Sequence, residues 1–483
     1  MLAAGNIHYE LSDRACAIGC GGIGAIHLLA HRIDLPALID RDVQLLKRHL
    51  PYHESDHVLS LAYNVLAGGT CIEDLELLRN DEAYLNALGA QRIPDPTTAG
   101  DFCRRFDSES QVLTLMEAIN QARLKVWKQQ EPEFFKQARL DADGTIAPTF
   151  GECKMGMNIS YDGQWGFHPL LISLANTREP LYLVNRSGNR PSHERADEYL
   201  DKAVALCRRG GFESILLRGD TDFMQTWKLD EWDRAGDITF IFGADARKEM
   251  VIRAELLPQS AWRRLDRPAK YEVKTEERAK PKNVKEAIVR AKGFENFVLQ
   301  WEDIAEFEHR PDKCDQAYRM IALRKRISME IGQDKLFEEY RYFFYITNDR
   351  QSTAGQIVLL ANDRCDQENL IEQLKNGVRA MRNPLDNLYS NWAYMVCATL
   401  AWNLKAWCGL LFPITPGRYQ SVHREQKQTL LRMEFKRFAA ALMNLPCQIV
   451  RGGRRIIFRL LNYNSWTASL LRLSRAMRLP LRC

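Results

Sequence analysis

Residues 139–145 read Arg139-Leu140-Asp141-Ala142-Asp143-Gly144-Thr145, and the architecture of the chain can be worked outward from this stretch. It lies within residues 138–146, which have the pattern of a short strand. Successive side chains of a strand point to opposite faces, so Asp141 and Asp143 share one face. The stretch therefore predicts a strand that presents two carboxylates on the same side.

An α/β domain with a mixed sheet is predicted around this strand. Further strands are expected at 167–174, 181–184, 214–217 and 237–242, with an amphipathic helix at 193–208. Asp220 follows just past the end of the buried strand 214–217. Ligands bind at that edge of an open sheet, which makes Asp220 a candidate site residue.

The flanking regions are predicted to be mainly helical. Apolar residues recur at three- and four-residue spacing within residues 11–137, and Thr97 and Thr98 offer hydroxyl caps to a short helix that precedes a basic pair. Residues 246–348 are highly charged and predicted to be partly β, with strands at 318–323 and 340–346. Helical periodicity resumes at residue 353 and continues to about residue 411.

The most apolar segment, residues 392–413, is the one candidate for a membrane span. It contains Asn403 and Lys405 near its centre, and a central Lys costs roughly 3 kcal/mol on insertion scales. We therefore expect a buried helix and no membrane partner. The first ten residues lack the basic and apolar regions of a targeting signal, so a cytoplasmic protein is predicted.

The composition is that of a globular protein: 483 residues, 46% hydrophobic and 27% charged. These values exclude a disordered chain, collagen and a small disulfide scaffold. The 12 cysteines are scattered, as buried thiols in a reducing cytosol are. Net charge is only +5, yet the 49 residues after Glu434 contain ten basic side chains and no acidic one. This basic tail indicates a polyanionic partner, nucleic acid rather than a membrane.

A third acidic position lies in residues 363–375, a strong helix-forming stretch with Glu368, Glu372 and Lys375 on one side. Phosphoryl transfer on nucleic acid uses carboxylates from separate elements to hold two metal ions roughly 4 Å apart. Oxygen ligands suit Mg²⁺, for which Mn²⁺ can substitute. An acid on a strand (Asp141 or Asp143), an acid at a strand end (Asp220) and a glutamate on a helix (Glu368) supply that pattern.

This combination resembles the bacterial insertion-sequence transposases of the DDE class, in the branch with an RNase-H-like fold. The matching stretches are 140–145, 186–189, 217–223 and 364–375. The last is similar to the Y-R-E-K signature of hairpin-forming cut-and-paste transposases. Arg364, Glu368 and Lys375 keep its spacing, whereas Ala361 stands at the Tyr position. The resemblance covers residues 45–411, including the apolar helix that begins at residue 392.

The resemblance implies that Asp143, Asp220 and Glu368 form the metal-binding catalytic triad. Asp141 is the main competitor for the first position, because it lies on the same strand face, and the Asp-Gly-Thr ending favours Asp143. Weaker competitors for the second and third positions are Asp222 and Glu372. Arg364 and Lys375 would bind DNA phosphates beside the cleavage site, where fixed cations stabilise developing charge.

The same resemblance implies a division of the chain and a set of partners. The expected regions are a helical N-terminal DNA-binding region (1–135), the first part of an RNase-H-like core (136–245), a β-containing insertion subdomain (246–350), a helical second part of the core with the glutamate (351–412) and a basic, helical C-terminal region (413–483). The partners would be double-stranded DNA, as terminal inverted repeats and target, and a second copy of the chain in a synaptic homodimer. Tryptophans of residues 221–301 are candidates for base stacking, with core packing as the competing interpretation.

Three further hypotheses stay open at this point. A transposase-derived protein that only binds DNA would have lost at least one of the acids. An RNase-H-fold nuclease would keep the acids and cut without strand transfer. Residues 19–24 satisfy the G-x-G-x-x-G pattern of a dinucleotide-binding dehydrogenase, although the flanking sequence does not predict a β-α-β unit.

Overall fold

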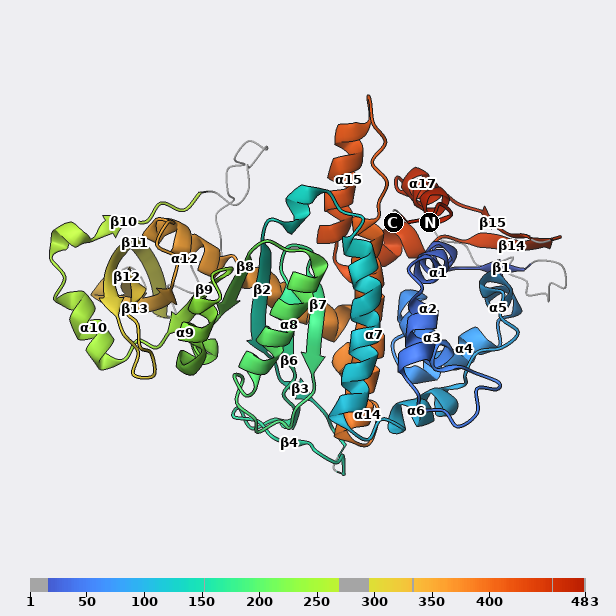
Figure 1. Cartoon of the computed structure of the whole chain (residues 1–483), viewed down its shortest axis with the longest axis horizontal. Coiled ribbons are helices and arrows are strands. Elements are labelled where there is room, and N and C mark those ends of the chain that lie inside the picture. The colour runs from blue at the N-terminus through green and yellow to red at the C-terminus, as the bar shows by residue number, and fades with distance from the viewer. Residues whose placement is uncertain (1–15, 152, 269–294, 332–333, 454, 482–483) are drawn as a thin grey trace.

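The computed structural model describes residues 16–151, 153–268, 295–331, 334–453 and 455–481. Figure 1 shows an elongated arrangement with the outer part of a large sheet at one end, the centre of that sheet with its helices in the middle, and a layer of helices at the other end. The N-terminal segment and the C-terminal segment both lie in this last layer (Figure 1).

Nine strands of the described residues form one mixed sheet, in the order β10-β11-β12-β13-β9-β8-β2-β6-β7. Its centre consists of β2 (Ala138–Gly144), β6 (Leu170–Leu174), β7 (Glu179–Val184), β8 (Ile215–Gly219) and β9 (Ile238–Ala244). β2 pairs antiparallel with β6 and parallel with β8; β6 and β7 are antiparallel, and β8 and β9 are parallel. All five strands were predicted, and every residue of β6, β7 and β8 is buried.

Helices connect the parallel strands, because two parallel neighbours need a crossover between them. α8 (Ala196–Gly210) precedes β8 and buries Tyr199, Ala203 and Cys207, which lie four residues apart along one face. It ends where Gly211 adopts a left-handed conformation with φ of 94°, a common way to terminate a helix. α9 (Thr226–Arg234) forms the next crossover, from β8 to β9.

The insertion continues the central sheet instead of forming a separate sheet. β10 (Arg263–Arg264), β11 (Glu295–His309), β12 (Tyr318–Ile331) and β13 (Asp334–Thr347) are joined to it because β13 pairs antiparallel with β9. The predicted strands 318–323 and 340–346 are parts of longer strands, and β11 was not predicted. These long strands mix charged and apolar residues without strict alternation, so their sequence pattern is weak. α10 (Lys248–Glu255) precedes them and α12 (Ala354–Asn362) follows.

The N-terminal region is helical as far as the structure describes it. Its helices are α1 (Ile23–Arg32), α2 (Leu35–Asp42), α3 (Glu54–Leu66), α4 (Leu75–Arg79), α5 (Glu82–Leu88), α6 (Pro96–Arg104) and α7 (Glu109–Trp127). The cap of α6 is Asp95, whose carboxylate accepts from the Thr98 N–H at 2.9 Å, so the expected hydroxyl cap is replaced by an acid one residue upstream of the helix.

The apolar segment predicted to be a buried helix is α14 (Leu388–Leu410), and every residue from position 390 to 410 is buried. It contacts α3 and α7 on one side and β7 on the other, between the sheet and the helical layer (Figure 1). Lys405 is buried as well, and its Nζ donates to the Leu431 carbonyl at 2.8 Å. No helix in the described parts of the chain is long and apolar enough to cross a membrane.

Glu179, at the start of β7, ties the helical layer to the sheet. Its buried carboxylate accepts from the indole N–H of Trp127 in α7 at 3.1 Å and from that of Trp407 in α14 at 2.8 Å. The guanidinium of Arg123, also in α7, lies 3.4 Å away. A buried carboxylate needs such partners, so this cluster fixes both helices against the sheet.

The C-terminal region contains a β-hairpin, and the prediction that it is helical is therefore wrong in part. Helices α15 (Gln420–Arg432), α16 (Phe435–Phe438) and α17 (Thr467–Met477) flank strands β14 (Cys447–Gly452) and β15 (Arg455–Leu460). β14 also pairs with β1 (Ala17–Ile18), and α17 packs on α1. The first and last described segments thus form one unit. A two-stranded hairpin alone is only marginally stable, and here a third strand and an apolar helix stabilise it.

The glycines of residues 19–24 serve this packing. A Cβ on Gly22 would lie 1.9 Å from the Leu442 carbonyl oxygen, and one on Gly21 would lie 2.5 Å from that of Leu445. Only glycine permits such an approach of two backbones. The stretch leads into α1 from the two-residue strand β1, without the β-α-β unit of a dinucleotide site.

Candidate active site

Asp143 and Asp220 meet at one edge of the sheet because of strand register. β2 and β8 are parallel neighbours in which Asp141 is paired with Arg218. Asp143 and Asp220 each lie two residues further along, so both side chains are found where these two strands end. This is the carboxyl edge at which open sheets bind ligands.

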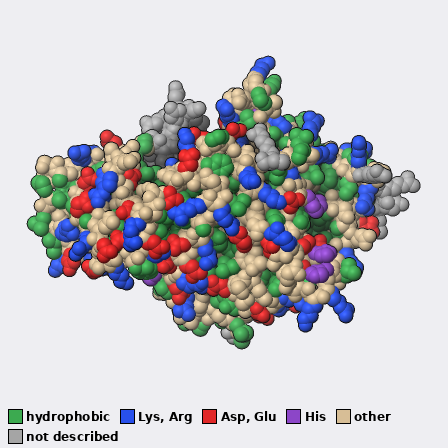
Figure 2. All heavy atoms as spheres, in the orientation of Figure 1, with side chains coloured by type: hydrophobic (Ala, Val, Ile, Leu, Met, Phe, Trp, Pro, Cys, Tyr) green, Lys and Arg blue, Asp and Glu red, His purple; other side chains and the backbone are tan. Residues whose placement is uncertain are grey.

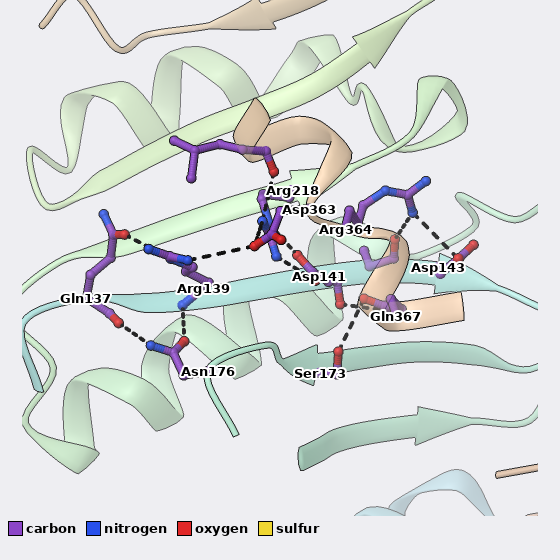
Figure 3. Close-up of polar contacts among 12 residues, drawn as sticks. Gln137, Arg139, Asp141, Asp143, Ser173, Asn176, Arg218, Asp363, Arg364 and Gln367 are labelled. Atoms are coloured by element: carbon purple, nitrogen blue, oxygen red, sulfur yellow. Dashed lines mark hydrogen bonds and ion pairs between the residues drawn. The ribbon is translucent and has the colours of Figure 1, made fainter. Parts of the chain in front are cut away.

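Arg364 joins the two acids from a third element. It is the residue before α13 (Cys365–Glu372), and its guanidinium nitrogens lie 3.5 Å from Asp143 Oδ2 and 3.5 Å from Asp220 Oδ2. Figure 3 shows Arg364 between the turn that opens α13 and the end of β2. Glu368 lies one helical turn after Arg364, near enough for its charge to raise the pKa of Asp143.

The pKa of Asp143 depends on its burial and on the charged side chains around it. Burial raises its pKa to about 7, and the neighbouring charges of Asp220 and Glu368 act in the same direction, against the lowering effect of Arg364. Burial also raises the pKa of Asp220, and this shift is opposed by the charge of Arg364 and by the hydrogen bond from the Asp222 N–H. Carboxylates that make each other harder to ionise are typical of a site that accommodates added positive charge.

Lys375 faces the same acids from the far end of α13. The helix passes into a π-helical turn, Gln373–Gly377, that contains Lys375. Burial lowers the pKa of this half-buried lysine, and the charges of Glu372 and Asp143 oppose the shift. Interruptions of this kind in a helix occur often at functional sites. Of the five residues predicted for the site, Asp143, Asp220 and Arg364 are in contact, and Glu368 and Lys375 are near enough for their charges to act on Asp143 or to respond to it.

The donor set suits a hard divalent cation. Asp143, Asp220 and Glu368 offer carboxylate oxygens alone, and the positive charge that relieves their repulsion now comes from the Arg364 guanidinium. Within the described ranges, no three His, Cys, Asp or Glu side chains are close enough together to hold a metal ion, so the acids converge without closing around one point. The residues fit a divalent ion by chemistry and by charge.

Asp141, the competing first acid, is differently engaged. Arg218 donates to both of its oxygens, from Nε to Oδ1 at 2.6 Å and from Nη2 to Oδ2 at 2.9 Å, and each side chain is only 1% exposed. Arg218 also donates to the Leu360 carbonyl at 2.8 Å, at the end of α12. Asp141 is thus one half of a buried ion pair, whereas Asp143 on the same strand faces Arg364 (Figure 3).

Two residues that the sequence reasoning missed hold α13 in place. One is Arg218, which connects β8, β2 and the end of α12. The other is Gln367, buried next to Glu368, whose Nε2 donates to the carbonyls of Asp141 and Leu171 at 3.1 Å each (Figure 3). A usable signal existed for the first residue: a charged side chain in a buried strand requires a partner, and Asp141 was available on the neighbouring strand.

Asp222 and Glu372, the weaker competitors for the second and third acids, make local hydrogen bonds. The Asp222 N–H donates to Asp220 Oδ1 at 3.0 Å, so this residue supports the aspartate that precedes it by two positions. The Glu372 carboxylate accepts from the Asn376 side chain at 2.7 Å, one turn further along the same helix. Asp220 and Glu368, in contrast, are the carboxylates whose charges raise the pKa of Asp143.

The tryptophans considered for base stacking differ in exposure. Trp232 and Trp262 are buried core residues, and Trp262 lies under the Arg324 guanidinium at 4.0 Å. Core packing therefore accounts for these two. Trp227 is 49% exposed, and its indole N–H donates to Asp197 at 3.0 Å.

The chain belongs to a family of transposases: the family model for the transposase DDE domain, group 1, matches residues 21–480. The resemblance inferred from the sequence is thereby confirmed. Among solved structures, the chain is similar to the piggyBac transposase in its synaptic complex with hairpin DNA, determined by cryo-electron microscopy. That match covers 87% of this chain and 82% of the other, with 10% sequence identity and a TM-score of 0.36. No curated protein matches the chain.

Proposed function

We propose that this protein is a DDE transposase that cleaves the ends of its own transposon and joins them to target DNA. The observation that supports the proposal is the contact of Arg364 with both Asp143 and Asp220, from three separate elements, in a member of a transposase family. Asp143, Asp220 and Glu368 would be the metal ligands, with Arg364 and Lys375 on the phosphate. Asp141 is set aside as the first ligand because both of its oxygens accept from Arg218.

The strand arrangement supports an RNase-H-like core. In the order β7-β6-β2-β8-β9, three antiparallel strands are followed by two that run parallel to β2. One acid lies on the central strand β2 and another just past the adjacent strand β8. Such a core would be formed by residues 136–245 and 351–412, with the sheet extension of residues 246–350 inserted before Glu368.

The residues of this chain would act by position and charge. When bound, a divalent ion such as Mg²⁺, or Mn²⁺ in its place, supplies activation of the attacking oxygen and neutralisation of the leaving oxygen. Arg364 and Lys375 would bind the non-bridging oxygens of the scissile phosphate, where fixed cations stabilise the transition state. Asp143 must be ionised to act as a ligand, so a proton on this group, whose pKa is about 7, would compete with the metal ion as the pH falls.

DNA contacts outside the catalytic site are proposed for both ends of the chain. The helices of residues 1–135 would recognise terminal inverted repeats, and the basic region 413–483 would hold DNA or the synapse. Figure 2 shows Lys and Arg side chains over α15 and around β14 and β15, and these two strands belong to the stretch after Glu434 that has no acid. Because two transposon ends must be processed together, the protein would act as a homodimer on DNA. It would be located in the cytoplasm, at the nucleoid.

Cleavage of a duplex that carries the element's own ends tests the proposal. The wild type is compared with Asp143→Ala, Asp220→Ala and Glu368→Ala, and with Asp141→Ala, in Mg²⁺ and in Mn²⁺. We expect the first three variants to bind ends without cutting them. A wild type that binds but never cuts would be a DNA-binding protein only, and one that cuts without joining would be a nuclease.

A further inference from the structure

The carboxyl end of α15 is fixed to the core by two basic side chains. The last carbonyls of a helix have no partner within the helix, and Lys or Arg side chains can bind them. Lys405 Nζ, from α14, donates to the Leu431 carbonyl at 2.8 Å. Arg178 Nη1 donates to the Arg432 carbonyl at 3.1 Å. Figure 1 shows α15 projecting beyond the rest of the helical layer, so these contacts hold the end at which it joins the body of the protein.

Arg178 also reaches the helix that carries the third acid. It lies in the turn between β6 and β7, where its carbonyl accepts from the indole N–H of Trp402 in α14 at 2.6 Å. From this fixed backbone, Arg178 Nη2 donates to Asp366 Oδ1 at 2.9 Å. Asp366 belongs to the first turn of α13, two residues before Glu368. One guanidinium therefore joins the end of α15 to the start of α13.

The segment that follows α15 contacts the other end of α13. Gln373 begins the π-helical turn after α13, and its Oε1 accepts from the Phe435 N–H at 2.9 Å. Gly377, which ends this turn, packs so closely on the same residue that a Cβ there would lie 3.0 Å from Phe435 Cβ. Residues 432–435 are therefore joined to α13 at both ends, through Arg178 at its start and through Gln373 at its end.

Glu368 depends on such contacts more than the other two acids do. Asp143 lies on β2 and Asp220 directly follows β8, and backbone hydrogen bonds of the sheet fix both strands. The backbone groups of a helix bind one another, so α13 is placed mainly by its side chains. Gln367 ties it to β2 and β6, and Asp366 ties it to Arg178. A displacement of about 1 Å at a reacting group can cost about 100-fold in rate.

We propose that Arg178 is a positioning residue for Glu368. By binding Asp366 and the end of α15 together, it sets the start of α13 and thereby the place of the Glu368 carboxylate relative to the other two acids. The inference rests on the proposed function, because it takes Glu368 to be a metal ligand. It also connects the C-terminal region, for which DNA binding is proposed, with the helix that completes the catalytic site.

The effect on the site can be separated from an effect on folding. The side chains of Arg178 and Asp366 are 22% and 45% exposed, and ion pairs of this kind contribute little to stability. The backbone at Arg178 has φ of 57°, a left-handed conformation that is as unfavourable for Met as for Arg. Arg178→Met therefore tests the guanidinium alone, while Lys405 still binds the end of α15.

Binding of Mn²⁺ to the protein on a duplex that already ends at the cleavage position tests the proposal without requiring cleavage. Electron paramagnetic resonance measures free Mn²⁺, and Glu368→Ala identifies the part of the binding that depends on this carboxylate. We expect Arg178→Met to raise the Kd of that part about 10-fold, as loss of a residue behind a metal ligand does, with affinity for the duplex unchanged. Arg178→Lys, which keeps the charge and can donate to both partners, should restore most of the Mn²⁺ binding.

A second variant shows whether Arg178 acts through Asp366. Asp366→Ala should weaken Mn²⁺ binding as Arg178→Met does, and the double variant should be no weaker, because both changes remove one contact. The matched control is Arg208→Met. It removes two hydrogen bonds to Asp237, of 2.8 and 2.6 Å, at the opposite edge of the sheet, and should leave Mn²⁺ binding unchanged.

The positioning role is overturned if Arg178→Met binds Mn²⁺ as the wild type does, or if Arg208→Met is weakened as much. It is also overturned if the effects of Arg178→Met and Asp366→Ala add in full, or if Mn²⁺ binding by the wild type does not depend on Glu368. A wild type that binds Mn²⁺ through Glu368 but never cuts an end would instead refute the proposed function, and the same titrations would still decide the role of Arg178.

Discussion

Removing Arg218 is the sharpest test of how the site is held together. Arg218→Met keeps most of the side-chain length but removes the charge and three hydrogen bonds, two to Asp141 and one to the Leu360 carbonyl. Both partners of the ion pair are 1% exposed, so water cannot replace the lost donors. Breaking a buried pair from one side costs about 3–5 kcal/mol, because it leaves the other charge uncompensated.

The loss of stability in Arg218→Met should depend on pH, and the pKa of Asp141 sets the direction. Burial already raises the pKa of Asp141, and Arg218 opposes that shift, so the variant raises the pKa further. A carboxyl whose folded pKa lies above its unfolded pKa is stabilised by taking up a proton. The loss of unfolding free energy should therefore be greatest at about pH 8 and should shrink toward about pH 5, as Asp141 becomes protonated.

Urea unfolding followed by tryptophan fluorescence measures the effect at both pH values. The control is the double variant Asp141→Leu/Arg218→Met, which removes both charges of this buried ion pair. Most of the lost stability should return in it. A loss below about 1 kcal/mol for Arg218→Met, or a loss independent of pH, would refute the reasoning. So would a double variant no more stable than the single one.

Three further predictions concern the acids and the helix that follows them. At a subsaturating Mg²⁺ concentration the cleavage rate should rise with pH through about 7, because a proton on Asp143 competes with the metal ion, and a flat profile between about pH 6 and pH 8 would contradict this. Arg364→Ala should lower the single-turnover cleavage rate about 100- to 1,000-fold while end binding persists, as loss of a donor to the developing charge does. Gln367→Leu removes three hydrogen bonds, two donated to carbonyls of β2 and β6 and one accepted from Ser173, and should reduce unfolding free energy by about 1–3 kcal/mol, measured by urea titration. Gln367→Glu, which has the same shape but cannot donate both bonds, should not restore it.

The chemistry of the candidate site could be recognised from the sequence. Local features indicated Asp141 together with Asp143, then Asp220, and Glu368 with Lys375, and the resemblance to DDE transposases favoured Asp143 and added Arg364. The same local patterns predicted the five central strands and the buried helix α14. A buried face gives a periodic pattern of apolar residues, and a fully buried segment gives a continuous apolar run.

The tertiary structure alone decided what depends on distant partners. Asp141 and Asp143 have the same local pattern, and only the contact with Arg218, 77 residues away, separates a buried ion pair from a residue of the site. In the same way, β13 pairs with β9 and β1 pairs with β14. The sequence of one strand does not predict which of the other strands it pairs with. Local sequence determines which face of an element is apolar or charged, whereas the partner of that face is chosen by the packing of the whole chain.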